Sequence, residues 1–267
     1  AQRMSDTRRR DAHKARKMTP QVKDWIEALI GQELSPQQVV DYLRRHNNVS
    51  LHHETVYQFI YTDKADGGEL YRHLRIASKP YRKRYGSYDS RGRIKNRVSI
   101  DERPAVVDRG NRVGDWEGDT VMGLRRKSAL LTMVERKTLY TVIARLTGKR
   151  ADLLATVAID SMHHLKDKIK TITLDNGLEF AKHEEIAKGL QADIYFAHPY
   201  CSWERGINEN TNGLIRQYFP KGTDFTKVTD EEIMFVMNRL NNRPRATRGG
   251  RSPNELLLGQ RVDLLAA

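Results

Sequence analysis

Three apolar stretches rich in β-branched residues follow one another closely after Gly114, at 116–122, 129–135 and 140–146. The segments between them, GLRRKS and RKTL, have the length of hairpin loops. Helical and extended patterns then alternate, with helices at 150–165, 179–190, 206–219 and 230–242 and strands at 171–175 and 193–198. The order βββαβαβαα predicts a three-stranded meander followed by parallel additions, and so a single mixed α/β sheet.

A small all-helical segment precedes the predicted sheet. Residues 19–62 have the pattern of three short helices, which begin near Thr19, Ser35 and Ser50. An inert three-helix bundle is one interpretation. A helix-turn-helix is the other, and we favour it because the third helix keeps a polar outer face that suits the major groove. That face consists of His52, His53, Thr55, Tyr57 and Gln58.

The positive charge of the chain is concentrated in two short stretches. The formal net charge is +13, and residues 1–18 hold seven basic and two acidic residues, whereas residues 79–97 hold eight basic and one acidic. A solvated linker is the usual interpretation of such a run. Because both runs flank the helical segment, and tyrosines interleave the second, we expect double-stranded DNA as the partner. The candidate phosphate contacts of the second run are Arg82, Lys83, Arg84, Arg91, Arg93, Lys95 and Arg97.

These patterns divide the chain into four parts. The predicted parts are a basic arm (1–18), a helix-turn-helix domain (19–63), a basic linker (64–112) and an α/β catalytic domain (113–267). No run of eighteen apolar residues is present, which excludes a transmembrane helix. The single cysteine, Cys201, excludes a disulfide within the chain and favours a reducing compartment. We therefore expect a cytoplasmic protein.

Three carboxylates occupy informative positions in the predicted sheet. Asp119 lies inside the first strand, Asp175 ends the strand TITLD, and Glu209 lies in the first turn of the helix that begins near Gly206. Each has a structural explanation when taken alone: an edge charge, a turn signal or a favourable charge at a helix start. Together they indicate a site, because the first and fourth strands would bring both aspartates to one spot if they are neighbours.

Three oxygen ligands of this kind suit Mg²⁺ or Mn²⁺. Two such ions, ~3.5–4 Å apart, would clamp the attacking and leaving oxygens of an in-line displacement at phosphorus. No covalent protein intermediate is needed, which agrees with the absence of a nucleophile motif. Glu204, five residues before Glu209, is an alternative third ligand.

With these motifs in place, the chain resembles the DDE transposases of bacterial insertion sequences, in particular the IS-thirty family. The resemblance is carried by SIDERPAVV, GDWEGDTVMG, TLDNGLEF, HPYCSWERGINENTNGLIRQYFPKGTDF and RPRATRGGRSPNELL. Asp175 and Glu209 are separated by 33 residues, the spacing of that family. The resemblance implies a ribonuclease-H-like fold with Asp119, Asp175 and Glu209 as the metal-binding triad. It also implies strand cleavage and transfer at terminal inverted repeats.

Other residues receive secondary roles. Arg205, Arg216 and Lys221 lie near Glu209 in the chain and are candidate phosphate contacts, with a solvated side chain as the alternative for each. Because two element ends must be cut in concert, we expect a homodimer. The alternatives to a transposase are a nuclease of the same fold that only hydrolyses DNA, and a non-catalytic DNA-binding regulator.

Overall fold

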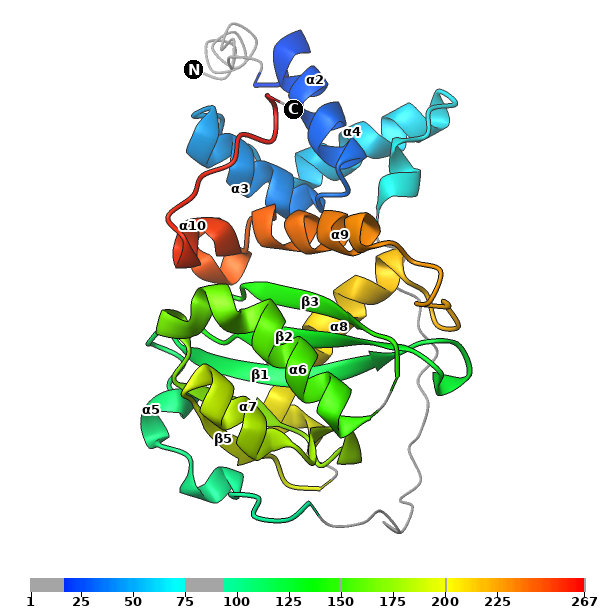
Figure 1. Cartoon of the computed structure of the whole chain (residues 1–267). Coiled ribbons are helices and arrows are strands. Elements are labelled where there is room, and N and C mark those ends of the chain that lie inside the picture. Colours follow the sequence, from blue (N-terminus) through cyan, green and yellow to red (C-terminus); the bar gives the residue numbers. More distant parts are fainter. Residues whose placement is uncertain (1–16, 75–93, 149, 200, 267) are drawn as a thin grey trace, which may run out of the picture. The chain divides into compact units, whose positions relative to one another are not determined.

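The chain divides into two compact units (Figure 1). The computed structural model describes residues 17–74, 94–148, 150–199 and 201–266. The helical unit comprises residues 1–81, 244–250 and 262–267, and the sheet unit comprises residues 82–243 and 251–261. Two C-terminal stretches thus cluster with the helices, although the sequence assigned them to the catalytic domain.

Three helices and a 3₁₀ turn form the N-terminal part of the helical unit. They are α2 (Pro20–Gly31), α3 (Pro36–His46), α4 (His53–Ala65) and η1 (Leu70–His73). Thr19 caps α2 through the Val22 N–H, and Ser35 forms a capping box with Gln38 at α3, as the sequence indicated. Apolar faces at helical spacing then meet in one core, which includes Ile26, Leu29, Leu43, Val56 and Ile60.

The third helix begins three residues later than the sequence predicted. Its N-cap is His52, whose ring Nδ1 accepts the Glu54 N–H at 3.3 Å, whereas Ser50 lies outside the helix. The prediction from Ser50 was wrong because a histidine ring performs the capping that serine usually performs.

The C-terminal residues complete the helical unit. The Tyr42 hydroxyl donates to Asp263 Oδ1 and accepts the Leu264 N–H, both at 2.8 Å. The side chain of Leu264 is 8% exposed and belongs to the helical core. Gln38 Nε2 also donates to the Pro244 carbonyl at 3.0 Å. These contacts explain why the last residues cluster with helices that lie more than 200 positions earlier.

The sheet unit contains one five-stranded sheet of order β3-β2-β1-β4-β5. Its strands are β1 (Asp115–Met122), β2 (Ala129–Glu135), β3 (Thr141–Leu146), β4 (Thr171–Leu174) and β5 (Asp193–Phe196). The β1–β2 and β2–β3 pairs are antiparallel, and the β1–β4 and β4–β5 pairs are parallel. The predicted mixed sheet of the order βββαβαβαα, with β1 beside β4, is confirmed.

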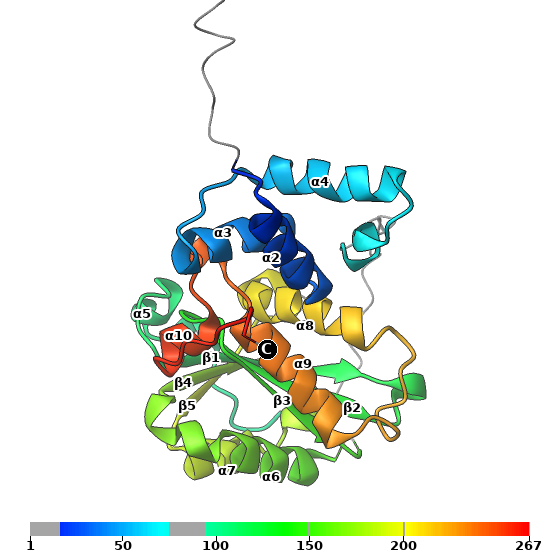
Figure 2. The ribbon, with the colours of Figure 1, turned by 90° about the horizontal axis from the view of Figure 1, so that it is seen from above.

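Helices cover both faces of this sheet, as the view in Figure 2 shows. The longer helices are α6 (Ala151–Met162), α7 (His183–Leu190), α8 (Gly206–Tyr218) and α9 (Asp230–Asn242). The shorter elements are α5 (Ala105–Asp108), α10 (Pro253–Leu257), η2 (Ile100–Glu102), η3 (Leu124–Arg126), η4 (His163–Lys168), η5 (Leu178–Phe180), η6 (Ser202–Arg205) and η7 (Ala246–Arg248), of which η7 belongs to the helical unit. Helices α6 and α7 lie on one face, and α8 and α9 lie on the other.

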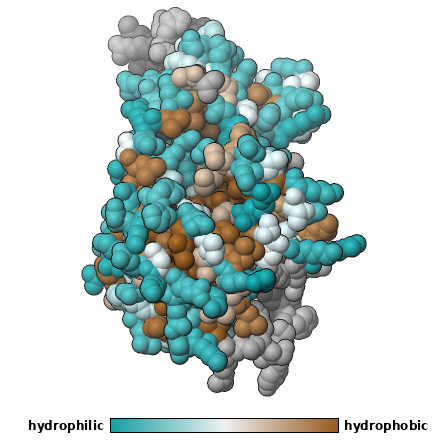
Figure 3. All heavy atoms as spheres, viewed as in Figure 1, coloured by the Kyte–Doolittle hydropathy of each residue, from teal (hydrophilic) through white to brown (hydrophobic). Residues whose placement is uncertain are grey.

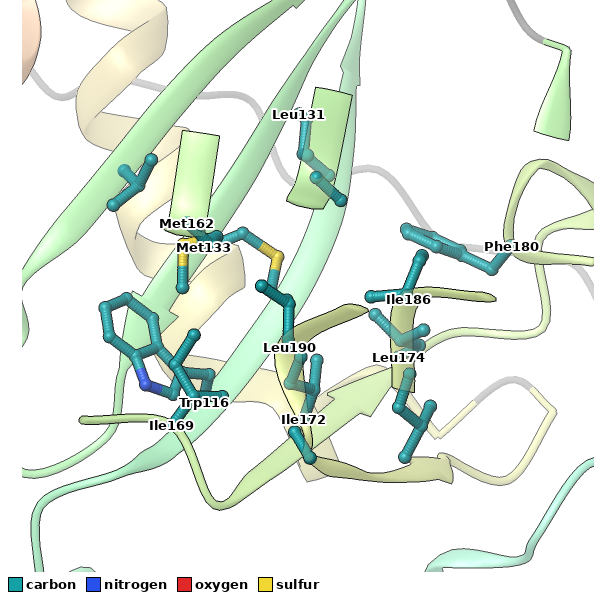
Figure 4. Close-up of a cluster of buried hydrophobic side chains, with 14 of the residues drawn as sticks. Trp116, Leu131, Met133, Met162, Ile169, Ile172, Leu174, Phe180, Ile186 and Leu190 are labelled. Atoms are coloured by element: carbon teal, nitrogen blue, oxygen red, sulfur yellow. The ribbon is translucent and has the colours of Figure 1, made fainter. Parts of the chain in front are cut away.

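Each face has its own apolar core. The core under α6 and α7 includes Trp116, Met133, Ile172 and Leu190 (Figure 4). Trp116 is fully buried and donates its indole N–H to the Lys168 carbonyl at 2.9 Å. The opposite core joins Val121, Leu130 and Ile143 of the sheet to side chains of α8 and α9. Alternate residues of β1 therefore serve opposite faces.

Part of the predicted linker folds onto the sheet unit. Residues 94–112 contain η2 and α5, Val107 is fully buried, and Ser99 forms a parallel bridge with Phe196. The predicted linker therefore includes an ordered part, and its apolar residues, spaced irregularly among charges, give no periodic signal. Among the described residues, no helix combines the length and apolar character needed to cross a bilayer. Hydrophilic residues cover most of the face drawn in Figure 3.

Candidate active site

Two aspartates meet where β1 and β4 run in parallel. The register pairs Glu117 of β1 with Thr173 of β4, and Asp119 and Asp175 follow two residues later in each segment. Side chains two residues apart along a strand point to the same face. Asp119 lies inside β1, and Asp175 is the first residue beyond β4. Both carboxylates therefore lie at the carboxyl end of the parallel pair.

Arg205 bridges these two carboxylates. Its Nη1 lies 3.5 Å from Asp119 Oδ2, and its Nη2 lies 3.7 Å from Asp175 Oδ2. The Nη1 group also donates to the Gly118 carbonyl at 3.3 Å. Only 11% of the Arg205 side chain is exposed, so one largely buried guanidinium serves two acidic groups.

The site carries an excess of negative charge. The pKa of Asp119 is raised to about 6, mainly by burial and also by the charges of Asp175 and Glu179, while Arg205 and the Thr120 N–H oppose the shift. Asp175 accepts the Gly177 N–H at 2.9 Å through its Oδ1, which fixes that carboxylate in a turn. The ionised Asp119 therefore has less positive charge near it than its burial requires.

Helix α8 is hydrogen-bonded directly to the strands that carry the site. Asn212 Nδ2 donates to Asp119 Oδ2 at 2.9 Å. Asn208 Nδ2 donates to the Glu117 carbonyl at 3.0 Å, and the Asn208 N–H donates to Glu117 Oε2 at 2.9 Å. The hydroxyl of Thr132 on β2 lies 3.0 Å from the Oδ1 atoms of both asparagines. These contacts fix the first turns of α8 against β1 and β2.

Glu117 is a buried acid that the sequence analysis did not single out. Its side chain is fully buried and pairs closely with Arg136, whose side chain is 12% exposed. Burial raises the pKa of Glu117, and the charge of Arg136 opposes the shift. A usable signal was present, because the motif WEGD places Glu117 two residues before Asp119 and so on the same strand face.

Glu209 lies in the first turn of α8, and its side chain is exposed. Among the described residues, no three His, Cys, Asp or Glu side chains are gathered closely enough to hold a metal ion. The structure thus brings together Asp119 and Asp175, while Glu209 is only carried by the helix that is hydrogen-bonded to Asp119. The role of all three as metal ligands stays a prediction.

The alternative third acid has another contact. Glu204 accepts the His198 N–H through Oε2 at 2.8 Å, and its Oε1 lies 2.8 Å from Nδ1 of the same histidine. His198 Nε2 lies 3.0 Å from Asp101 Oδ2. Glu204 therefore helps to fix the loop that leads to α8.

The arginine and lysine near the end of α8 differ in their surroundings. Arg216 Nη2 donates to the Met122 carbonyl at 2.6 Å, and Nη1 lies 3.4 and 3.3 Å from the carbonyls of Phe219 and Pro220. Burial lowers the pKa of Arg216. Lys221 is exposed in the turn after α8. Their phosphate contacts stay predictions, and Arg216 also has a clear structural role in joining α8 to the end of β1.

Of the basic run at residues 79–97, the structure describes only residues 94–97. Arg82, Lys83, Arg84, Arg91 and Arg93 lie outside the described residues. Lys95 is exposed. Arg97 is also exposed, and its guanidinium donates to Asn176 Oδ1, next to Asp175. One predicted DNA contact therefore lies beside the aspartate pair.

The outer face of α4 is more aromatic than expected. The rings of His53 and Tyr57 lie 6.4 Å apart, and those of Tyr57 and Tyr61 lie 6.1 Å apart, so one row of rings follows the helix. Tyr61, which the sequence analysis did not include, is 56% exposed. The spacing of four residues was the available signal. The remaining predicted residues of this face are His52 and Gln58, both exposed, and Thr55, which is half-buried.

The order of elements and the sheet topology define a ribonuclease-H-like protein. The chain is 46% identical over 255 residues to the transposase for insertion sequence element IS4351 of Bacteroides fragilis, covering 96% of this chain and 78% of the relative. It is 36% identical over 236 residues to transposase InsI for insertion sequence element IS30A of Escherichia coli (strain K12), covering 84% of this chain and 61% of the relative. No family model matches the chain.

Among solved structures, the catalytic core domain of BIV integrase matches with a TM-score of 0.41 and 18% identity, over 55% of this chain and 95% of that one. The sequence relatives show the family: this chain belongs to the bacterial insertion-sequence transposases. It spans about three fifths of the length of the Escherichia coli relative (61%).

Proposed function

We propose that this chain catalyses metal-dependent strand cleavage and strand transfer at the terminal inverted repeats of an insertion sequence. Asp119, Asp175 and Glu209 are its acidic triad in this proposal. The observation that supports it is the pairing of Asp119 with Asp175 across the parallel strands, with α8 hydrogen-bonded to Asp119 through Asn212. Glu209 lies three residues before Asn212 and so on the same side of that helix.

The aspartate pair suits Mg²⁺ or Mn²⁺. Proteins usually bind Mg²⁺ through one or two carboxylates, with waters and substrate phosphates completing the shell. Burial penalises the ionised form of Asp119, so a cation has a buried charge to stabilise there. When bound, two such ions supply Lewis-acid stabilisation of the attacking and leaving oxygens in an in-line displacement.

The residues around the triad orient it. Asn212 donates to Oδ2 of Asp119, and the Gly177 N–H donates to Oδ1 of Asp175. Each donor restricts the rotation of one carboxylate. The protein thereby holds the oxygen ligands ready, and no covalent protein–DNA intermediate is required.

Double-stranded DNA is the proposed substrate and target. Face residues of α4 in the helical unit are proposed to contact the major groove, and Lys95 and Arg97 to contact phosphates beside the aspartate pair. Cutting two element ends in concert requires at least a homodimer. The proposed location is the bacterial cytoplasm, on the nucleoid.

A strand-transfer assay tests this proposal. The protein is mixed with pre-cut element ends, a target plasmid and Mg²⁺, and joined products are measured. We expect joining by the wild type and none by Asp175→Asn, which should still bind end DNA. Nicking without joining would favour the hydrolytic nuclease, and binding with no chemistry in any metal would favour the regulator.

A second comparison assigns the third acid. Glu209→Gln should abolish joining, whereas Glu204→Gln should retain it, because Glu204 bonds to His198 at the preceding loop. The opposite result would transfer the third role to Glu204.

A further inference from the structure

We infer that Arg205 competes with divalent cations for Asp119 and Asp175, and that a cation which displaces it frees the guanidinium to bind a DNA phosphate. This inference rests on the proposed metal site. It gives Arg205 a role beyond that of a fixed phosphate contact: the same side chain serves two anions in succession.

Arg205 occupies the position that a cation held by both aspartates would take. The two terminal nitrogens of Arg205 lie 3.5 and 3.7 Å from Oδ2 of Asp119 and Oδ2 of Asp175. A divalent cation held by both aspartates would have to approach the same carboxylates. A guanidinium cannot keep that position beside the cation, because two positive charges at contact distance repel each other strongly in a largely buried site. Occupation by one therefore excludes the other.

Arg205 is held loosely. Both distances to the aspartates exceed normal hydrogen-bond length, and the hydrogen bond to the Gly118 carbonyl is long at 3.3 Å. Its Nε is buried and has no hydrogen-bond partner among the described residues. The arginine of the neighbouring pair, Arg136, instead forms a close hydrogen bond to Glu117. Arg205 is thus placed by charge more than by directed bonds.

The backbone beside Arg205, at the start of α8, is open on one side. Arg205 is the last residue of η6 and directly precedes α8. The next residue is Gly206, and a side chain built there would meet nothing within 4 Å, so the backbone is uncrowded at this junction. The forked donors of a guanidinium that leaves the aspartates match the oxygens of a phosphate.

The consequence is a coupling between metal and DNA. A cation that displaces Arg205 also creates a phosphate-binding group, so each ligand should increase the affinity of the other. While Arg205 covers the aspartates, the apparent affinity for metal is reduced by the fraction of molecules in which the site is open.

Titration of the full chain with Mn²⁺ tests this inference, with free Mn²⁺ measured by electron paramagnetic resonance. Arg205→Gln should bind Mn²⁺ more tightly than the wild type, by ~10-fold if the guanidinium is displaced about one tenth of the time. Arg145→Gln is the matched control: Arg145 pairs with Asp230 at 2.9 Å, and its loss should leave Mn²⁺ binding unchanged. In Mn²⁺, Arg205→Gln should also bind end DNA more weakly than the wild type.

The outcomes separate this inference from the proposed function. If Asp175→Asn binds Mn²⁺ as well as the wild type does, the metal site itself is wrong. If Asp175→Asn loses Mn²⁺ but Arg205→Gln binds it no more tightly than the wild type, the competition is wrong and the metal site stands. Circular dichroism checks folding. Should Arg205→Gln fail to fold, Arg205→Met replaces it, because methionine is long and uncharged, and an unchanged Mn²⁺ affinity then overturns the inference.

Discussion

Two acids on β1, only two residues apart on the same face, have very different surroundings. Glu117 is fully buried, pairs closely with Arg136 and accepts the Asn208 N–H. The side chain of Asp119 is 22% exposed, and its arginine lies at 3.5 Å. Glu117, the inner acid, has its own close partner in Arg136. Asp119, the outer acid, shares Arg205 with Asp175.

The difference separates a structural carboxylate from one that can bind a ligand. A buried acid whose oxygens already have close donors offers nothing to a ligand, and its loss leaves other buried groups without partners. An acid with loosely placed positive charge can exchange that charge for a cation. Two residues apart on one strand, Glu117 holds α8 in place, whereas Asp119 is placed for the proposed chemistry.

The largest expected effect is on the inner acid. Glu117→Ala should lower the free energy of unfolding by about 3–5 kcal/mol, because it leaves Arg136 buried without its partner. Urea denaturation measures this, with Asp119→Asn as the control that should not lose stability. A loss no larger than that of the control would mean that the two acids do not differ as described.

The pH dependence of stability tests the outer acid. The pKa of Asp119 is raised to about 6 by burial, so between roughly pH 4 and this value the folded protein binds more protons than the unfolded chain. The contribution of Asp119 is therefore fully present at low pH and is lost as pH rises, by about 3 kcal/mol. Urea denaturation of the wild type and of Asp119→Asn across this range should show that the variant lacks this loss. Parallel curves would contradict the raised pKa.

A smaller effect is expected from the amide that orients Asp119. Asn212→Ala removes the donor at 2.9 Å from Asp119 and should cost about 1 kcal/mol of stability. Strand transfer should fall ~10-fold, as for other residues that orient metal ligands. Asn254→Ala, which removes a hydrogen bond to Asn242 away from the site, is the control and should leave strand transfer intact. Equal activities of the two variants would argue against an orienting role.

The smallest effect extends the comparison to the two acids beside His198, Glu204 and Asp101. Glu204, and then Asp101, raise the pKa of His198 through hydrogen bonds. The stabilisation is therefore complete below the unfolded pKa of roughly 6.5 and is lost as pH rises through the higher folded value. His198→Asn should lower the melting temperature slightly at about pH 5.5 and not at about pH 8.5. An equal loss at both values would show that the charge of His198 is not involved.

Most of the fold could be predicted from the sequence because local pattern determines it. The strands at 129–135 and 171–174 and the helix at 230–242 agree with the predicted ranges within a residue, since their apolar residues alternate or recur at helical spacing. The start of α4 could not be predicted in this way, because capping by the His52 ring has no common signature.

The candidate site was predictable in its acids but not in its basic partners. A carboxylate inside an apolar strand is unusual enough to mark Asp119. Strand register determines the close pairing of Glu117 with Arg136. Contacts across up to 86 residues of chain place Arg205 between two aspartates. Such contacts leave no periodic pattern, because any of many arginines would fit the sequence equally well.

The hydrogen bonds of Tyr42 to the last residues of the chain constrain how the molecule is made. During synthesis, the N-terminal helices emerge from the ribosome long before Asp263 and Leu264, so the core they form must wait for its final side chain. A product that terminates early leaves that core open. Synthesis through Leu264 is thereby coupled to completion of the helical core, and a copy that lacks this residue lacks that stabilisation.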